Sequence, residues 1–156
     1  MARQPGLLTA QLLSRFMWFD GALQRNLDAR GWGGVRRLES MTMMYVHAGV
    51  TRPSELARLI GVTRQSMNTA LRELEEKRLV RLVPDPDDKR CKIVEFDPAG
   101  DAMRAEALHV VEALEALLDE RLGAGAADRL AALLDADWGE APLLEAGEKT
   151  KKKEAL

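Results

Sequence analysis

The feature that most constrains this chain is a pair of short helix patterns followed directly by a two-strand pattern. Apolar side chains recur at helical spacing through both helix patterns, at Leu56, Ile60, Val62, Met67, Leu71 and Leu74. Ala57 is small enough to let two helix backbones approach, and Gly61 can take the positive φ of a tight turn. The spacing predicts helices over 53–60 and 63–78 and a hairpin over 79–96. That order is the order of a winged helix-turn-helix.

The outer face of the second predicted helix is polar, and its N-terminal half contains no acidic residue. Thr63 is expected to cap the helix. A single stripe at helical spacing follows, made of Arg64, Gln65, Asn68, Thr69 and Arg72. Arg pairs with guanine, Asn and Gln pair with adenine, and Thr contacts a thymine methyl group or a phosphate. A solvated helix face is the alternative. The acids are confined to Glu73, Glu75 and Glu76, away from a groove-facing N-terminus, which favours double-stranded DNA as the partner.

The hairpin is predicted by β-forming residues on either side of a turn rich in Pro and Asp. The basic residues near its tip are Lys89, Arg90 and Lys92. A guanidinium at this tip can enter a narrow minor groove, where the potential is most negative. Asp88 is expected to support the wing by holding Arg90 in position. Asp85 and Asp87 are interpreted as residues of a solvated turn.

The distribution of charge is uneven, although the formal net charge is only −2. Residues 52–92 contain ten basic and seven acidic side chains, whereas residues 93–148 contain three basic and fourteen acidic ones. Contacts to phosphate depend on the local field rather than on the average. We therefore expect the helix-turn-helix and hairpin to face DNA and the acidic C-terminal helices to face away.

Three further helix patterns flank this region, at about 7–29, 98–122 and 126–138. Their apolar positions are Leu8, Leu12, Leu13, Phe16, Phe19 and Leu23, then Met103, Ala107, Val110, Val111, Leu114, Leu117, Leu118 and Leu122, and last Leu130, Leu133 and Leu134. Asp97 and Pro98 form a helix start signal, and Gly123 and Gly125 interrupt the pattern. A small winged-helix domain cannot cover so long an apolar stripe, so these helices predict a homodimer interface. An intrachain helical bundle is the alternative.

The expected fold class is mainly α with a small β-hairpin, a winged helix-turn-helix with dimerisation helices at both ends. The expected parts are an N-terminal dimerisation helix (1–34), a DNA-binding domain (35–97), C-terminal dimerisation helices (98–140) and a flexible Lys-rich tail (141–156). No apolar run has membrane-spanning length, so neither a membrane partner nor a signal peptide is expected.

The sequence contains few patterns that are typical of catalytic or metal-binding sites. His47 and His109 are far apart, and Cys91 is the single cysteine. No metal site, cofactor or nucleophile–base pair is predicted, and an enzyme is not expected. A lone cysteine suits a reducing cytoplasm. Two basic neighbours of Cys91 could lower its pKa, which leaves a redox-responsive regulator as an alternative.

Residues from about 35 to 122 resemble the MarR family of bacterial transcriptional regulators. The matching segments are 54–62, 71–80, 84–90 and 96–100, and the wing motif Asp-x-Arg falls on Asp88 and Arg90. The resemblance implies a homodimer whose recognition helices enter successive major grooves, with Arg90 in a minor groove. Arg78 stands where the family usually has Gly, at a cost of roughly 1 kcal/mol if it is left-handed. Residues 32–35 also depart from the family's usual sequence.

The resemblance further implies a small aromatic or phenolic effector bound in a crevice between the DNA-binding lobe and the dimer helices. The expected lining residues are Arg15, Trp18, Phe19, Met41, Met44, Tyr45 and Val111. Methionines and aromatics form adaptable apolar pockets, and an arginine can hold a carboxylate, but ordinary core packing is the alternative. The expected function is a repressor released by its effector. A winged-helix module that binds proteins without reading DNA is the second hypothesis.

Overall fold

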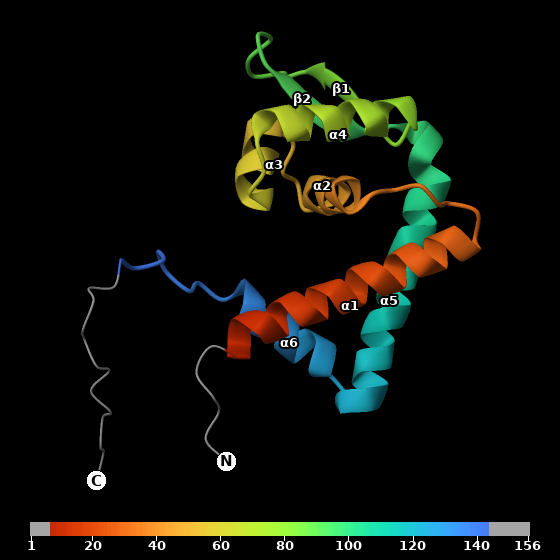
Figure 1. The fold of residues 1–156 in the computed structure, drawn as a ribbon, viewed down its shortest axis with the longest axis vertical. Helices are drawn as coiled ribbons and strands as arrows, with labels where there is room; N and C mark the ends of the chain where they lie inside the picture. Colours follow the sequence, from red (N-terminus) through yellow and green to blue (C-terminus); the bar gives the residue numbers. More distant parts are fainter. Residues whose placement is uncertain (1–6, 144–156) are drawn as a thin grey trace. The chain divides into compact units, whose positions relative to one another are not determined.

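The computed structural model describes residues 7–143, so residues 144–156 of the predicted tail lie outside the described residues. The elements in chain order are α1 (Leu7–Ala29), α2 (Arg37–His47), α3 (Pro53–Ile60), α4 (Arg64–Glu76), β1 (Val80–Pro84), β2 (Lys92–Phe96), the 3-10 turn η1 (Pro98–Gly100), α5 (Asp101–Leu122) and α6 (Ala126–Asp135) (Figure 1). The predicted fold class is confirmed, a mainly helical chain with one antiparallel hairpin. The described residues divide into two compact units, 7–117 and 118–143.

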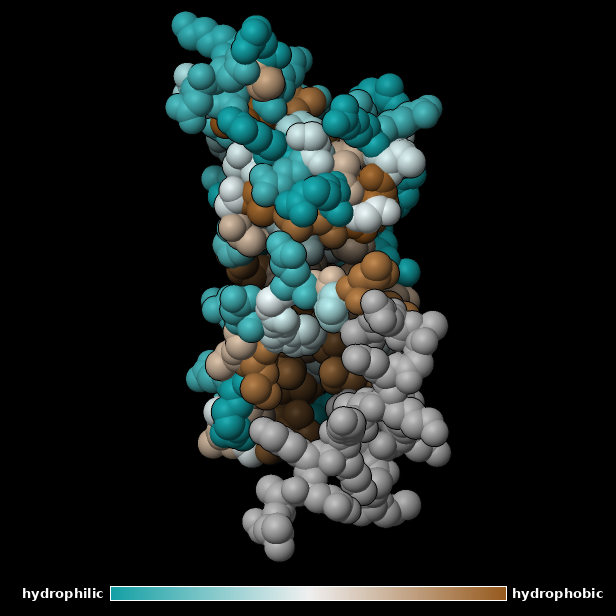
Figure 2. Space-filling view, turned by 90° about the vertical axis from the view of Figure 1, so that its left-hand side faces the viewer, coloured by the Kyte–Doolittle hydropathy of each residue, from teal (hydrophilic) through white to brown (hydrophobic). Residues whose placement is uncertain are grey.

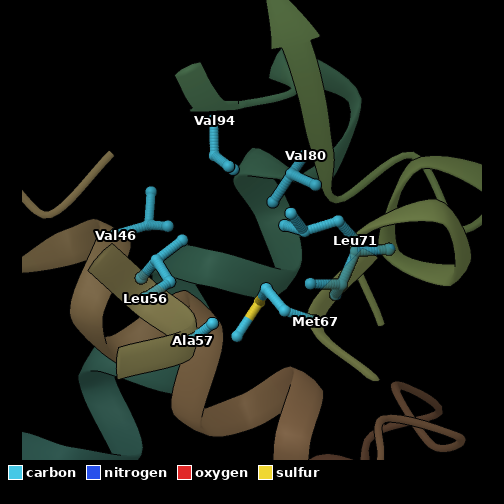
Figure 3. Packing of buried hydrophobic residues seen from close by; sticks show 8 residues of the cluster. Val46, Leu56, Ala57, Met67, Leu71, Val80 and Val94 are labelled. Atoms are coloured by element: carbon cyan, nitrogen blue, oxygen red, sulfur yellow. The ribbon is translucent and has the colours of Figure 1, made fainter. Parts of the chain in front are cut away.

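One hydrophobic core holds the helix-turn-helix and the hairpin together. Its buried members are Val46, Leu56, Ala57, Met67, Leu71, Leu74, Val80 and Val94 (Figure 3). They come from α2, α3, α4 and both strands, so five short elements share a single interior. Leu56, Met67 and Leu74 have no exposure to solvent. Burying a side chain of this size contributes about 1.5–3 kcal/mol, which is how helices too short to be stable alone persist here.

Local backbone chemistry sets the ends of α3 and α4. Gly61 ends α3 with φ of 77°, and its N–H donates to Ala57 O at 3.0 Å. The Thr63 hydroxyl accepts the Ser66 N–H at 3.1 Å, so Thr63 caps α4 and the helix begins one residue after the predicted position. The prediction also placed the C-terminus of α4 too far along the chain, at residue 78 instead of Glu76. Arg78 has φ of 56°, a left-handed conformation that ends the helix before it.

The hairpin is attached to the core through alternate residues. Val80 pairs with Phe96 and Leu82 with Val94, which turns Val80 and Val94 towards α4. The Val94 N–H also donates to Thr51 O at 2.8 Å. The hairpin therefore bonds to the segment that enters α3 as well as packing on the helices.

A second core joins α1 to α5. Its buried residues are Ala22, Leu23 and Leu27 from α1 and Met103, Val110 and Leu114 from α5. The predicted helix start at Asp97 is partly corrected, because residues 98–100 form the separate turn η1 before α5 begins. Gly100 lies there for reasons of space: a Cβ on it would stand 3.1 Å from the Leu79 Cα.

The second unit contains α6 and the turn before it. The Asp119 carboxylate accepts the Gly125 N–H at 3.0 Å and the Ala127 N–H at 2.9 Å, and these bonds hold the pKa of Asp119 below its ordinary value. The helix ends at Asp135 rather than at the predicted Trp138, because Ala136 is extended. Within residues 7–143, no helix combines the length and apolar composition that a bilayer crossing requires.

Candidate nucleic-acid interface

The outer face of α4 is free of the core. Arg64, Gln65, Asn68 and Arg72 are exposed and Thr69 is half-buried, whereas the buried residues of α4 are Met67, Ala70, Leu71 and Leu74. The predicted stripe and the core face therefore lie on opposite sides of one helix. Thr63 is less available than the others, since its hydroxyl lies 2.9 Å from the Ser66 hydroxyl as well as accepting the Ser66 N–H. The recognition roles of these residues stay predictions.

A hollow of about 320 Å³ lies where α3 meets α4, lined by Pro53, Ser54, Arg64 and Asn68. Pro53 and Ser54 belong to the first turn of α3, where the helix dipole attracts anions; Pro53 has no N–H, so Ser54 offers the backbone donor. The guanidinium of Arg64 adds a positive charge on the other side. This combination suits a phosphate oxygen beside the base edges that α4 faces.

The wing presents its cations to solvent. Lys89, Arg90 and Lys92 are exposed, and the Arg90 side chain is 91% accessible. The Asp88 carboxylate accepts from both the backbone N–H and the Nε of Arg90, each at 3.1 Å. These bonds lower the pKa of Asp88, with the Arg90 side chain as the largest cause. The Asp-x-Arg motif thus forms a closed contact in which Asp88 holds the Arg90 guanidinium through Nε and Nη2, while the arginine side chain as a whole stays accessible to solvent.

The interpretation of Asp85 as a solvated turn residue is wrong. Asp85 is only 3% exposed, and its carboxylate accepts two hydrogen bonds from Arg52 and one from the Asp87 N–H. These contacts lower its pKa, with the Asp87 backbone bond as the largest cause. The Pro/Asp-rich sequence indicated a turn correctly, but the partner of Asp85 lies 33 positions away and no local pattern signals it. Asp87 is exposed, as interpreted.

The expected effect on Cys91 is wrong in direction. The negative charge of Asp88 is the largest cause acting on this thiol, and it raises the Cys91 pKa above the ordinary value of 9.0. The Cys91 thiol donates to Asp88 at 3.6 Å. The carboxylate of Asp88 affects the Cys91 pKa more than the basic sequence neighbours do, so the lowered pKa that favoured the redox alternative is not found.

A buried ion cluster, not predicted from the sequence, contacts the C-terminal half of α4. Glu39 of α2 is completely buried, and both of its oxygens accept from Lys77 Nζ, at 2.7 and 2.6 Å. Lys77 also donates to Gly34 O at 2.6 Å, and Arg36 pairs with Glu73. The cluster joins the α1–α2 connection and α2 to the C-terminal half of α4. A buried Glu that caps its own helix through Arg36 N–H looks like an ordinary N3 residue in the sequence.

The predicted effector residues divide between two cores. Trp18, Phe19 and Val111 pack against the α1–α5 core, and Tyr45 packs against the helix-turn-helix core. Trp18 and Phe19 meet edge to face, with ring centroids 5.0 Å apart. Met41 is half-buried, while Arg15 and Met44 are exposed. Core packing accounts for the placement of the first four, and an effector role for any of the seven stays a prediction.

Comparison with known proteins gives the same fold. The sequence profile of the MarR family matches residues 34–90. Structures similar to this one include apo MarR from E. coli (21% identity, 86% of this chain and 96% of that chain, TM-score 0.62) and the transcriptional regulator PA4135 (22%, 85% and 94%, 0.66). A MepR variant from S. aureus, solved with an oligodeoxyribonucleotide, is also similar (17%, 85% and 94%, 0.52). No significant match was found among curated proteins.

Proposed function

We propose that this chain, whose residues 34–90 match the sequence profile of the MarR family, is a DNA-binding transcriptional regulator of that family and acts as a homodimer. The observation that carries the proposal is the joint presentation of two cationic surfaces. The exposed face of α4 offers Arg64, Gln65, Asn68 and Arg72, and the wing offers Arg90. Hydrophilic side chains cover the hairpin end of the molecule (Figure 2). A helix of this composition fits a major groove while the wing arginine fits the adjacent minor groove.

Dimerisation is supported by apolar side chains that the described chain leaves uncovered. Leu13 of α1 is 62% exposed, and Leu122 and Leu133 near the other end are 67% and 68% exposed. None of the residues of α6 is buried. Large apolar side chains left exposed are candidates for burial in an interface, and two copies of one chain can cover each other's exposed faces symmetrically. A dimer also doubles the number of base contacts and sets the spacing of two half-sites about one helical turn apart.

The proposal extends to repression relieved by a small aromatic or phenolic effector. S. aureus MepR has been solved with ethidium bromide, an aromatic molecule. An effector releases a repressor only if it binds more tightly to the conformation that fits DNA poorly. In this chain Met43 packs against both the helix-turn-helix core and the α1–α5 core. A ligand that rearranges this packing would therefore change the relation between α4 and the helices that bear the dimer contacts.

Selection from a pool of random duplexes tests the function directly. We expect the wild-type protein to enrich a pseudo-palindrome and to bind it more tightly than random duplex. Affinity for both should fall steeply between about 50 and 200 mM salt, since each phosphate contact releases counterions. Light scattering at the same protein concentration should report a dimer. Enrichment of no sequence, with equal and weak binding to every duplex, would favour the protein-interaction module, and a stable monomer would contradict the two-half-site arrangement.

A further inference from the structure

The hairpin is tied to the start of α3 by one ion pair between Arg52 and Asp85. Arg52 is the N-cap residue of α3, and Asp85 follows directly after β1. Nε and Nη2 of Arg52 both donate to Oδ2 of Asp85, at 3.2 and 2.9 Å. The Asp85 side chain is 4% accessible and that of Arg52 is 56% accessible. The carboxylate is therefore held in the protein while the guanidinium covers it from the solvent side.

Asp85 is also the point at which the tip of the wing is anchored. Its second oxygen, Oδ1, accepts the Asp87 N–H at 2.9 Å, and its own N–H donates to Cys91 O at 3.0 Å. Asp85 thus bonds to both ends of the loop, through Asp87 and Cys91, and also holds the side chain of Arg52. On the opposite side of the hairpin, Thr51 O accepts the Val94 N–H at 2.8 Å. Residues 51 and 52 therefore bond to the hairpin at two points, β2 and the residue that follows β1.

The tip itself has few other constraints. Within the described part of the chain, the hydrogen bonds recorded for residues 86–91 all end on residues 85–91. The contact between Asp88 and Arg90 lies wholly inside the tip, so it orients the arginine relative to the loop and not relative to α4. The link from the loop to the helix-turn-helix runs through Asp85.

We propose that Arg52 and Asp85 are a positioning pair that aims the wing, setting where Arg90 lies relative to the recognition helix α4. The inference rests on the proposed DNA-binding function and adds to it a residue pair that touches no base. Arg90 can reach a minor groove only while α4 occupies the neighbouring major groove, and that requires a fixed offset between the two. The ion pair supplies the offset because one partner begins α3, which packs on α4, and the other closes the loop that bears Arg90.

A double-mutant cycle on the full-length protein tests the inference. The probe is the duplex that the wild-type protein enriches from the random pool. Asp85→Asn keeps an acceptor for the Asp87 N–H and removes the charge that holds Arg52, whereas Arg52→Gln removes the other partner. Each is measured alone and together with Arg90→Ala. Arg81→Gln is the matched control, because it removes one cation from the same hairpin by breaking the exposed Arg81–Glu95 pair.

If the pair acts through Arg90, each single variant weakens binding about tenfold, as Arg90→Ala does. Once Arg90 is absent, the same changes shift affinity by less than about twofold, since there is no guanidinium left to aim. Hydroxyl-radical protection of the minor groove at the flanks is lost in Asp85→Asn, while guanine N7 protection under α4 persists. Arg81→Gln produces an equal small loss in both backgrounds.

Three results would overturn the inference. Asp85→Asn could bind as wild type, or its loss could add fully to that of Arg90→Ala, or the loss in Arg52→Gln could be the same with and without Arg90, which would make Arg52 a direct phosphate contact. Thermal melting monitors folding. If Asp85→Asn is unfolded, the cycle of Arg52→Gln with Arg90→Ala decides, with Arg52→Lys expected to lose less than Arg52→Gln. A wild-type protein that enriches no duplex contradicts the proposed function itself, whereas enrichment with any of these three results contradicts only the positioning pair.

Discussion

The ammonium group of Lys77 lies 2.6 Å from the carboxylate of Glu39, a side chain with no exposure to solvent. We expect Lys77→Met to destabilise the protein by about 3 kcal/mol, because it removes the nearer of the two cations that pair with a buried carboxylate and leaves only Arg36, 3.9 Å away. Glu39 keeps the Arg36 N–H as a donor, which places the effect at the lower end of the usual range. Urea denaturation at fixed protein concentration measures it.

Two further variants separate the lost pair from a general effect of losing a cation. Arg58→Ala breaks the exposed Arg58–Glu55 pair and should cost less than about 1 kcal/mol. The double variant Glu39→Gln/Lys77→Met contains no unpaired buried charge and should recover much of the stability lost in Lys77→Met. A Lys77→Met protein as stable as Arg58→Ala would show that the cluster contributes little.

Arg78 pays a conformational penalty that glycine avoids, because its φ is 56°. Replacing it with Gly should stabilise the protein by up to about 1 kcal/mol, the strain relieved being partly offset by the greater freedom of Gly in the unfolded chain. Glu76→Gly, at the last residue of the right-handed helix α4, should destabilise the protein by up to about 1 kcal/mol, the cost of glycine in a helix interior. Thermal melting of both proteins distinguishes these opposite signs. A loss of stability in Arg78→Gly would mean that the Arg78 side chain makes a favourable contact that outweighs the strain.

Alanine substitutions in α4 and in the wing should change DNA affinity in different ways. Asn68→Ala or Arg64→Ala should lose about 1–3 kcal/mol on the selected duplex, and the loss should vanish when the base pair that each reads is replaced. Arg90→Ala should weaken every duplex broadly. Fluorescence anisotropy titrations on single-substitution duplexes and on random duplex provide the measurement. Equal losses on selected and random DNA for all three variants would remove α4 as the reader.

Cys91 should be a slow nucleophile. Because Asp88 raises its pKa, little thiolate forms near neutral pH and the thiolate appears only as the pH rises above the ordinary value of 9.0. Asp88→Asn removes the charge and should lower the pKa, so that alkylation by iodoacetamide at mildly alkaline pH becomes faster. Asp87→Asn is the matched neighbour and should alkylate like wild type. Peroxide at modest dose should leave DNA affinity unchanged. Rapid alkylation of the wild type, or peroxide-induced release from DNA, would restore the redox alternative.

The sequence was sufficient where structure depends on neighbouring residues. The bounds of α1 and α3 agree with prediction, and the left-handed Gly61 and the Thr63 cap follow from residues within one turn of each other. The last turns of α4 and α6 were placed too far along the chain. Spacing of apolar residues continues past those ends, whereas the backbone at Arg78 and Ala136 does not.

Ion pairs between residues far apart in the sequence could not be predicted. Asp85 and Glu39 are charged, and charged residues are rarely buried unless they are paired. Their partners Arg52 and Lys77 lie 33 and 38 positions away, at distances in sequence where many cations are equally eligible. Only the packing of α3 against the hairpin, and of α2 against α4, selects them. The exposed stripe of α4 was easier to identify because one face of a helix is defined by periodicity alone.

Gly100 leaves no clearance between two parts of the chain that have different tasks. A Cβ at this position would stand 3.1 Å from the Leu79 Cα and 3.2 Å from the Arg78 carbonyl oxygen. Those two residues link the recognition helix to the hairpin, and η1 leads into the long helix α5. Two of the three nearest atoms are backbone, so rotating the Leu79 side chain alone would not make room for a methyl group. Alanine at this one site would consequently have to push the α4–β1 link and the start of α5 apart by a few tenths of an ångström.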